Sequence, residues 1–295
     1  MPADGAASTL SPVVAGCMRL ADPSMDATQR LGWIERCVDL GVTSFDHADI
    51  YGGYTCEALF GEALALSPSL RQRLQIVTKC GIRTVSPRRP AHALNHYDSS
   101  RAHVLASVDE SLRALRTDHV DLLLIHRPDA LMDPDELADT FQGLKAAGKV
   151  RAFGVSNHSP AQLAMLHRRH PLVTNQIEFS PLQMRALADG TLDQCTDLGL
   201  RPMVWSPLGR GRLFAADDVQ AQRVRGVLEA LAAAYGHSPA TMAYAWILRH
   251  PSRPLPITGS LRIEALREAV AALDVRISPA DWYRVWEASM GHGVA

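Results

Sequence analysis

The sequence is poor in lysine, in paired cysteines and in net charge, and each shortage excludes a class of protein. Only three of the 30 basic residues are lysines: Lys79, Lys145 and Lys149. The formal net charge is −1, which gives no electrostatic reason to expect nucleic acid or an anionic membrane as a partner. The five cysteines are scattered and include no CxxC pair, which indicates reduced thiols in a cytoplasmic protein and not a zinc site.

Long apolar segments are also missing. No stretch approaches the roughly 20 apolar residues that a membrane span needs. The first ten residues, MPADGAASTL, have neither a basic start nor an apolar core, so we expect no secretory signal. The chain is 47% hydrophobic and 21% charged, which suffices for a full core. Without a linker or a low-complexity run, the sequence predicts a single domain over residues 1–295.

Short apolar runs alternate with longer helical patterns along the chain, and eight strand-then-helix units can be traced. The strands are expected at 11–16, 42–48, 74–81, 119–126, 150–157, 172–179, 201–207 and 254–260. Their runs are continuously apolar, as in a parallel sheet covered on its outer face. Eight units in roughly 250 residues predict an α/β fold, a (β/α)8 TIM barrel. A doubly wound sheet is the fallback, although no GxGxxG follows the first strand.

The helices have recognisable boundaries. They are expected near 28–41, 55–66, 99–116, 133–148, 159–169, 185–198, 217–250 and 262–273, with a last one near 279–290. Ser99 or Ser100, Asp133 and Ser159 are predicted N-caps, and Pro160 suits the first helical position after Ser159.

Polar side chains follow three neighbouring strands where each strand ends. Asp46, Lys79 and His126 end the second, third and fourth strands, and Tyr51 lies in the loop after Asp46. In barrels of this kind the chemistry takes place at the C-terminal ends of the strands. Each residue alone has a structural explanation, such as a loop cap for Asp46 or a lysine that extends to the rim. Their joint occurrence favours a site.

Together the four side chains can act as one proton donor. A free phenol has a pKa of about 10, which is high for a donor at neutral pH. A lysine ammonium beside Tyr51 should lower that pKa, and a carboxylate should keep the ammonium charged. The imidazole could orient the substrate oxygen or help relay the proton. The set suits protonation of an oxygen that becomes negative as hydride reaches its carbon.

A metal site fits these residues less well. His47 and Asp49 have no HxH or HExxH partner. If 42–48 is a strand, His47 and Asp46 also face opposite sides of the sheet. We therefore expect His47 and Asp49 to be outer-face or loop residues, and no metal is predicted.

The same segments resemble signatures of the aldo-keto reductase family. GVTSFDHADIYG (41–52), IVTKCG (76–81), VDLLLIHRPD (120–129) and GKVRAFGVSNHS (148–159) resemble its aspartate–tyrosine, lysine, histidine and Gly-Val-Ser-Asn motifs. NQIEFSPL (175–182), WSPLGRG (205–211) and ITGSLRIEALREA (257–269) resemble its cofactor segments. The resemblance runs from about residue 12 to 270 in matching order, which makes it specific.

This resemblance implies an NAD(P)H-dependent reductase of aldehydes or ketones, in which the tetrad is Asp46, Tyr51, Lys79 and His126. It implies NADPH as the cofactor, with NADH possible, bound extended across the barrel mouth. Ser156, Asn157 and Gln176 would hold the carboxamide, and Trp205 would stack on the nicotinamide. The further cofactor-binding residues that it implies are Met18, Asp46, Ser206, Pro207, Leu208, Gly209, Arg210, Gly259, Ser260, Arg262 and Glu268.

The chain departs from the family at several positions. Gly259 stands where many members carry a lysine for the 2′-phosphate, and Ala265 and Ala269 stand where many carry arginine and asparagine. Arg262 could replace that charge or could simply be solvated. The tail GHGVA is too short for the family's C-terminal loop. Residues 19–27 and the loop 82–100, a plausible lid, are therefore expected to shape the pocket.

Several alternatives stay open on the sequence alone. Some relatives with this fold are regulatory subunits that sense nicotinamide and dock on other proteins, although the intact tetrad argues for catalysis. A barrel-strand lysine is also the hallmark of Schiff-base aldolases, which would make Lys79 a nucleophile. The loop residues Arg83, Arg88, Arg89, His92 and His96 suggest tolerance of polar or anionic substrates, or are solvated. The expected partner is a small carbonyl compound, and a monomer is favoured.

Overall fold

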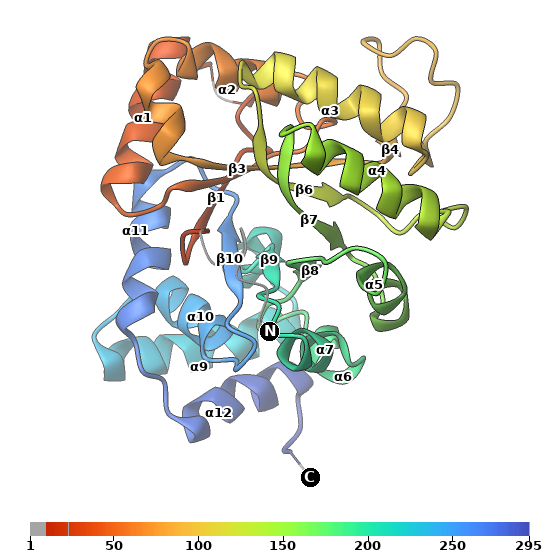
Figure 1. Cartoon of the computed structure of the whole chain (residues 1–295). Helices are drawn as coiled ribbons and strands as arrows, with labels where there is room; N and C mark the ends of the chain where they lie inside the picture. The colour runs from red at the N-terminus through yellow and green to blue at the C-terminus, as the bar shows by residue number, and fades with distance from the viewer. Residues whose placement is uncertain (1–9, 23, 295) are drawn as a thin grey trace.

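A computed structural model describes residues 10–22 and 24–294 and confirms the predicted barrel. Eight parallel strands close in the order β1 (Val14–Gly16), β10 (Leu255–Thr258), β9 (Met203–Trp205), β8 (Asn175–Glu178), β7 (Val150–Ser156), β6 (Val120–Ile125), β3 (Gln75–Cys80) and β2 (Ser44–Asp46). Helices surround this sheet (Figure 1). Within the described part, no helix has the length and apolar character needed to cross a membrane. We expected no secretory signal in the first ten residues. Residues 1–9 lie outside the described part, so the structure says nothing of this expectation there.

The connecting helices begin close to the predicted caps. They are α1 (Ala27–Asp39), α2 (Cys56–Leu64), α3 (Arg101–Leu115), α4 (Pro134–Ala146), α5 (Pro160–His167), α6 (Arg185–Ala188), α7 (Thr191–Asp197), α8 (Arg212–Ala215), α9 (Val219–Tyr235), α10 (Pro239–Leu248), α11 (Ile263–Ala271) and α12 (Pro279–Met290). Ser100 caps α3, Asp133 caps α4, and Ser159 forms a capping box with Gln162 at the start of α5. The described cysteines are all free and buried.

The single helix predicted near 185–198 is divided, so this prediction was wrong, and the helical sequence predicted from about 217 to 250 forms two helices. The segment 185–198 breaks at Gly190, whose φ of +81° is left-handed. The segment 217–250 breaks at Gly236, with φ of +72°, and Ser238 then caps α10 in front of Pro239. In both places a glycine takes a conformation that other residues rarely adopt, which ends the helix before it.

The expected loop 82–100 contains a short hairpin. β4 (Ile82–Arg83) pairs antiparallel with β5 (His96–Tyr97), and the chain between them runs beside α3 (Figure 1). The Arg83 guanidinium lies 3.0 Å from the Asp98 carboxylate, and the Thr84 amide donates to the Tyr54 hydroxyl. The Arg83–Asp98 pair lies within the segment, and the Tyr54 contact attaches it to the loop after β2. Its role as a lid stays a prediction.

The inner face of the barrel positions the polar strand ends. Its apolar filling is Leu10, Val14, Val77, Leu122, Leu124, Ala152, Val173, Met203, Leu255 and Ile257. Because side chains alternate along a strand, the residue two positions further also faces inward. Lys79 follows Val77, and His126 follows Leu124. The polar groups at the mouth therefore continue the inner face upward from its apolar filling.

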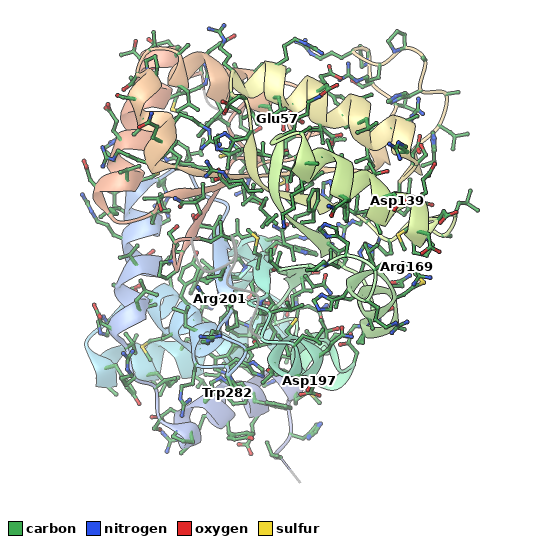
Figure 2. All side chains as sticks on the ribbon, viewed as in Figure 1. Glu57, Asp139, Arg169, Asp197, Arg201 and Trp282 are labelled. Carbon is green, nitrogen blue, oxygen red and sulfur yellow. The ribbon has the colours of Figure 1, made fainter. Side chains whose placement is uncertain are left out.

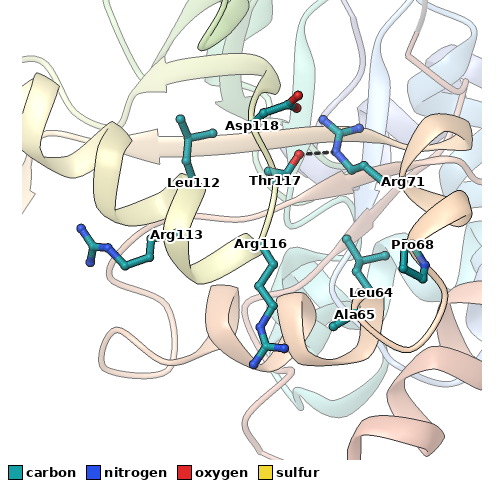
Figure 3. Close-up of a pocket in the computed structure, with 9 residues that line it drawn as sticks. All are labelled: Leu64, Ala65, Pro68, Arg71, Leu112, Arg113, Arg116, Thr117 and Asp118. Atoms are coloured by element: carbon teal, nitrogen blue, oxygen red, sulfur yellow. Dashed lines mark hydrogen bonds between the residues drawn. The ribbon is translucent and has the colours of Figure 1, made fainter.

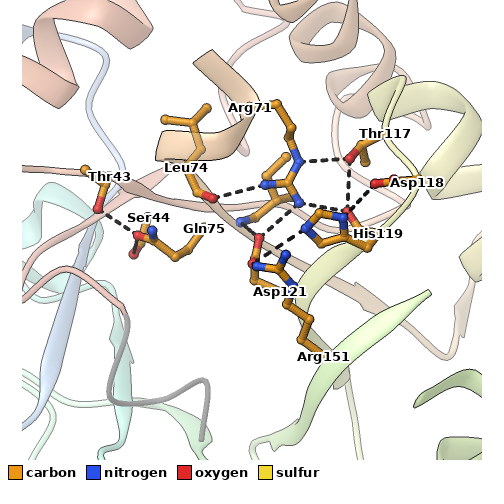
Figure 4. A network of polar contacts seen from close by, with 11 residues as sticks. Thr43, Ser44, Arg71, Leu74, Gln75, Thr117, Asp118, His119, Asp121 and Arg151 are labelled. Atoms are coloured by element: carbon orange, nitrogen blue, oxygen red, sulfur yellow. Dashed lines mark hydrogen bonds and ion pairs between the residues drawn. The ribbon is translucent and has the colours of Figure 1, made fainter. Parts of the chain in front are cut away.

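The opposite end of the barrel is held by a separate polar network (Figure 4). Asp121 is buried and accepts hydrogen bonds from Arg71, from Arg151 and from the Ile76 amide. Arg71 also donates to Thr117 at 2.8 Å. These contacts link β3, β6 and β7 where the strands begin, so this network has a structural role.

A hollow of about 720 Å³ lies at the same end (Figure 3). It is bordered by the end of α2 and by residues 112–118 at the end of α3. Its arginines are Arg71, Arg113 and Arg116, and Arg71 is already bound by Asp121. This hollow is therefore remote from the strand ends that carry the predicted chemistry.

Close contacts between helices fix the outer layer. Gly61 in α2 lies against α3, where a Cβ atom would come within 2.1 Å of the Ala114 carbonyl oxygen. At the other side of the molecule, Trp282 of α12 stacks on Trp246 of α10 with 5.0 Å between ring centroids (Figure 2). Only a residue without a side chain fits at position 61.

We expect Gly61→Ala to destabilise the protein and Gly143→Ala to stabilise it. Both glycines lie inside helices, but a Cβ on Gly143 meets nothing within 4 Å. The first change should lower the free energy of unfolding by about 2–3 kcal/mol because α2 and α3 must separate. The second should raise it by roughly 0.5–1 kcal/mol through helix propensity. Urea unfolding followed by circular dichroism measures both, and equal effects would contradict the close contact.

Candidate active site

The side chain of Lys79 is fully buried at the mouth of the barrel, and its ammonium has three acceptors. It donates to the Asp46 Oδ2 atom at 2.7 Å, to the His47 carbonyl at 2.8 Å and to the Tyr51 hydroxyl at 3.1 Å. The Nζ atom also lies 4.9 Å from the centre of the Tyr51 ring. Three of the four predicted catalytic residues are thus in direct contact, although they come from β2, the following loop and β3.

The second oxygen of Asp46 is bound from across the barrel. Gln176 on β8 donates its Nε2 atom to Asp46 Oδ1 at 2.7 Å. The Oε1 atom of Gln176 accepts no hydrogen bond from the described residues, which leaves one amide acceptor available. The carboxylate of Asp46 therefore joins two distant parts of the mouth, since Lys79 binds one oxygen and Gln176 the other.

The environment keeps Lys79 charged. Burial alone lowers the pKa of Lys79, but the Asp46 carboxylate and the Tyr51 hydroxyl raise it, and the net result is a pKa above 10.5. The Lys79 nitrogen is protonated and so has no free lone pair, and three acceptors hold it in place. Lys79 therefore acts as a fixed positive charge in this geometry.

The pKa of Tyr51 differs from the expectation. Burial raises this pKa above 10.0, while the nearby Lys79 ammonium lowers it only in part. We predicted that Lys79 would lower the pKa of Tyr51 below its ordinary value. The net shift is upward, so this prediction was wrong. The expectation took account of the charge next to the phenol and left out its desolvation. At neutral pH Tyr51 keeps its proton, and Lys79 stands ready to stabilise the phenolate.

His126 completes the group from the end of β6. Its ring is T-shaped to that of Tyr51, with 6.0 Å between the centroids. Its Nδ1 atom is buried without a hydrogen-bond partner among the described residues. Burial, then Lys79, then Arg127 lower the pKa of His126 well below 6.5. The imidazole is therefore neutral at pH 7 and can offer one N–H as a hydrogen-bond donor.

A chain of hydrogen bonds continues along the mouth from β7 to β9. Ser156 donates to the Gln176 carbonyl at 3.0 Å, and Asn157 donates to the Ser156 hydroxyl at 2.7 Å. The Trp205 indole donates to Asn157 Oδ1 at 3.1 Å. Asn157 has a left-handed φ of +57°, an uncommon conformation that such contacts can hold in place. The structure thus brings together the four residues predicted to surround the nicotinamide.

The turn after β9 combines small residues, left-handed backbone and a cation. Ser206, Gly209, Arg210 and Gly211 all have φ between +54° and +87°. Arg210 is exposed; its Cζ atom lies 5.2 Å from the centre of the Trp205 ring, and its Nε atom lies 3.9 Å from Glu178. The Gly209 amide donates to the Ser206 carbonyl and the Gly211 amide to the Leu208 carbonyl, so the exposed Arg210 is the group of this turn that suits a phosphate.

The other predicted cofactor residues are placed less uniformly. Pro207 is buried, and Leu208 packs against the outer core. Met18 is half exposed, and its carbonyl accepts from Cys56. Ser260 accepts from the Arg262 amide, and the Arg262 side chain is exposed.

Glu268 has a partner away from the mouth. Its carboxylate accepts from Ser238, the N-cap of α10, at 2.7 Å. The structure therefore does not bring Glu268 into contact with the mouth residues described above.

Two arginines at the mouth were not singled out by the sequence. Arg19 reaches from the loop after β1 to the Gly259 carbonyl, with 3.3 Å between the atoms. Arg127, next to His126, lies over the Trp205 ring at 5.8 Å. Arg19 lies within residues 19–27, which were expected to shape the pocket, and Arg127 directly follows His126, but arginine is common throughout this chain.

His47 and Asp49 lie outside the barrel, as their alternation predicted. The His47 ring packs against Phe60 of α2 at 4.6 Å, and burial lowers the pKa of His47 to about 3. Asp49 accepts hydrogen bonds from the Ile50 amide and from Ser107 of α3. Both residues therefore belong to the layer between the sheet and the helices.

Glu57, a buried residue of α2, lies in the same outer layer (Figure 2). It accepts from Thr78, which precedes Lys79 on β3 and faces outward. Burial raises the pKa of Glu57 to about 7 and, together with the charge of Glu57, raises that of Asp49 well above 3.8. A polar cavity of about 510 Å³ lies between these acids, α3 and the 82–100 segment.

Comparisons with known proteins agree with the geometry. The model of the Aldo/keto reductase family matches residues 12–289. Oxidoreductase YdhF of Escherichia coli (strain K12) is 52% identical over 285 residues, which are 95% of this chain and 94% of that protein. A 6-dehydroglucose reductase of Agrobacterium fabrum (strain C58) is 39% identical and covers 97% of this chain and 96% of its own.

A solved structure is similar as well. The aldo/keto reductase from Klebsiella pneumoniae in complex with NADP and acetate superimposes with a TM-score of 0.77 at 25% sequence identity. The match covers 94% of this chain and 90% of that one. The resemblance noted in the sequence is thereby confirmed.

We expect Glu57→Gln to stabilise the protein more at pH 8 than at pH 5. The pKa of Glu57 is about 7 in the folded state against an ordinary 4.5. The folded state therefore binds more protons between these values, and the free energy of unfolding falls as the pH rises through them. Glutamine does not titrate, so the variant should gain about 1–3 kcal/mol over the wild type at pH 8 relative to pH 5.

Urea unfolding at several pH values measures this difference. Glu62→Gln is the matched control, because Glu62 lies on the same helix α2 but is exposed. Its effect should not change with pH. If the effect of Glu57→Gln did not change with pH, the Glu57 carboxyl group would have the same pKa in the folded and unfolded states, which would contradict the prediction.

Proposed function

The chain belongs to the aldo/keto reductase family, and from this premise we propose that it reduces an aldehyde or ketone to the alcohol with a nicotinamide cofactor. The observation that carries the proposal is the contact of Tyr51 with the buried, charged Lys79. Tyr51 is the general acid, Lys79 and Asp46 stabilise the phenolate that remains, and His126 positions the carbonyl oxygen.

The charge states support these roles. Tyr51 keeps its proton at neutral pH, so the group that must be donated is present. Loss of that proton leaves an anion 3.1 Å from an ammonium that cannot move away, because Asp46 and the His47 carbonyl also hold it. Neutral His126 can donate one hydrogen bond to the carbonyl oxygen without adding a second full positive charge.

The residues at the mouth fit a nicotinamide dinucleotide. Gln176 Oε1, Ser156 and Asn157 offer neutral groups to a carboxamide, and Trp205 offers an aromatic face. The turn 206–211 offers the exposed Arg210 to a diphosphate. A bound NADPH, or NADH, would supply the hydride. NADPH is proposed as the preferred form, and the NADP complex of the Klebsiella structure supports it.

The proposed substrate is a small polar carbonyl compound. The relative from Agrobacterium fabrum is named a 6-dehydroglucose reductase, and it covers nearly the whole chain. The mouth of this chain is lined by polar and charged groups, among them Lys79, His126 and Arg127. Such a lining suits a substrate that carries oxygen atoms besides its carbonyl.

The alternative of a Schiff-base aldolase is disfavoured by the state of Lys79. A lysine nucleophile needs a neutral amine with a free lone pair. The pKa of Lys79 is raised, and its ammonium has three acceptors. Trapping of a carbonyl compound on Lys79 by borohydride would reverse this conclusion.

We expect Tyr51→Phe to lower kcat for carbonyl reduction by about 10²–10⁴-fold, because the proton donor is lost. Binding of NADPH, measured by calorimetry, should be unchanged, since the phenol holds Lys79 and not the nucleotide. Tyr54→Phe is the matched control: Tyr54 lies in the same segment but accepts from Thr84 of the hairpin. That variant should keep turnover within about threefold.

Two results would count against the proposed function. Wild-type turnover by the Tyr51→Phe variant would remove the phenol from the mechanism. Tight NADPH binding by the wild type without reduction across a panel of aldehydes and ketones would instead favour a regulatory subunit that senses nicotinamide.

A further inference from the structure

Two of the positive charges near the mouth already have an anionic partner. Lys79 is paired with Asp46 at 2.7 Å, and Arg210 lies 3.9 Å from Glu178. In the loop 82–100, whose basic residues suggested tolerance of anionic substrates, Arg83 and Arg89 also face carboxylates, while Arg88 is exposed. The paired cations are therefore at least partly neutralised within the protein.

Two of the loop arginines have structural partners, Arg83 within the loop and Arg89 on α3. Arg83 binds Asp98 at 3.0 Å and donates to His92 at 3.3 Å. Arg89 pairs with Glu110 of α3 and lies over the Tyr54 ring at 4.5 Å. These side chains face the polar cavity beside α3 and not the inner face of the barrel. They do not supply a free cation for a substrate.

Arg127 differs from all of these. It directly follows His126, is half-buried, and lies over the Trp205 ring at 5.8 Å. Within residues 10–22 and 24–294, its side chain makes no hydrogen bond and no ion pair. Its charge acts on the site, because it contributes to the lowered pKa of His126. Arg19, at the same mouth, also has no carboxylate partner among the described residues, but it donates to the Gly259 carbonyl, whereas the Arg127 side chain has no such acceptor there.

We propose that Arg127 binds an anionic group of the substrate, so that the preferred substrates are short oxo acids. The inference rests on the proposed reductase function, because it places the carbonyl oxygen at His126 and Tyr51. The Arg127 guanidinium lies over Trp205, whose indole binds Asn157 at the same mouth, so we place the anion beside the carbonyl site. A guanidinium matches a carboxylate in a planar, two-bond geometry, which lysine cannot reproduce.

The test compares two substrates that differ in one group. 4-Oxobutanoate and butanal have the same chain length, but only the first carries a carboxylate. We expect the wild type to favour 4-oxobutanoate by about 10–100-fold in kcat/KM, the range of one charge-assisted contact. Arg127→Gln should abolish this preference by raising KM for the oxo acid. The kcat/KM for butanal should change by less than about threefold.

Two matched variants separate charge from shape and position. Arg127→Lys should keep part of the preference, because the charge remains while the planar fork is lost. Arg113→Gln removes an arginine near the start of the barrel strands and should have no effect on either substrate. NADPH affinity, measured by calorimetry, should be equal in all variants. A selective loss of NADPH affinity in Arg127→Gln would assign the residue to the cofactor and overturn the inference.

A binding measurement keeps the inference distinguishable from the proposed reaction. Succinate carries carboxylates but no carbonyl to reduce, and its affinity for the NADP⁺-bound protein can be measured by calorimetry. Succinate binding that Arg127→Gln weakens about tenfold or more would support the anion site even if no aldehyde is reduced. Equal succinate binding by both proteins, or equal use of both aldehydes by the wild type, would refute the role of Arg127.

Discussion

The contact between the Lys79 ammonium and the Asp46 carboxylate is the interaction on which the mouth of the barrel depends. Both groups are buried, and removing one partner of such a pair typically costs about 3–5 kcal/mol because the other charge is left uncompensated. Asp46 is held by Gln176 from across the barrel, and Lys79 holds Tyr51. Closure of the barrel therefore determines where the phenol lies, although Tyr51 itself belongs to a loop.

The sequence was sufficient to predict the barrel and many of the residues that meet at its mouth, although Arg19 and Arg127 were missed and Glu268 lies elsewhere. Continuous apolar runs marked the strands, and the polar residue at the end of each run marked the C-terminal face. The breaks were missed because a glycine inside a helical pattern can be tolerated or can end the helix, and the pattern alone does not decide; Gly190 and Gly236 end theirs. The sign of the Tyr51 pKa shift was missed because desolvation depends on everything packed around the phenol.

The layer between the sheet and the helices explains why the polar motif after β2 was ambiguous. Asp46 faces inward, whereas His47 and Glu57 face the helices and Asp49 reaches α3. Burial favours the neutral form of both His47 and Glu57, so Lys79 has few full charges behind it. A row of ionisable residues in the sequence thus becomes one ion pair inside the barrel and a largely uncharged layer outside it.

Lysine is rare in this sequence, which helped to single out Lys79. Arginine is common, so Arg127 could not be singled out in the same way. Composition alone does not show which of many arginines has a functional role. The hydrogen-bond and ion-pair partners of each arginine in the folded chain do distinguish them. Arg71, Arg83 and Arg89 each face a carboxylate and so have structural roles. A half-buried guanidinium without such a partner is less stable than a paired one, because it has lost part of its hydration and gained no anion. Its position beside His126 is therefore most readily explained by an anion that arrives with the substrate.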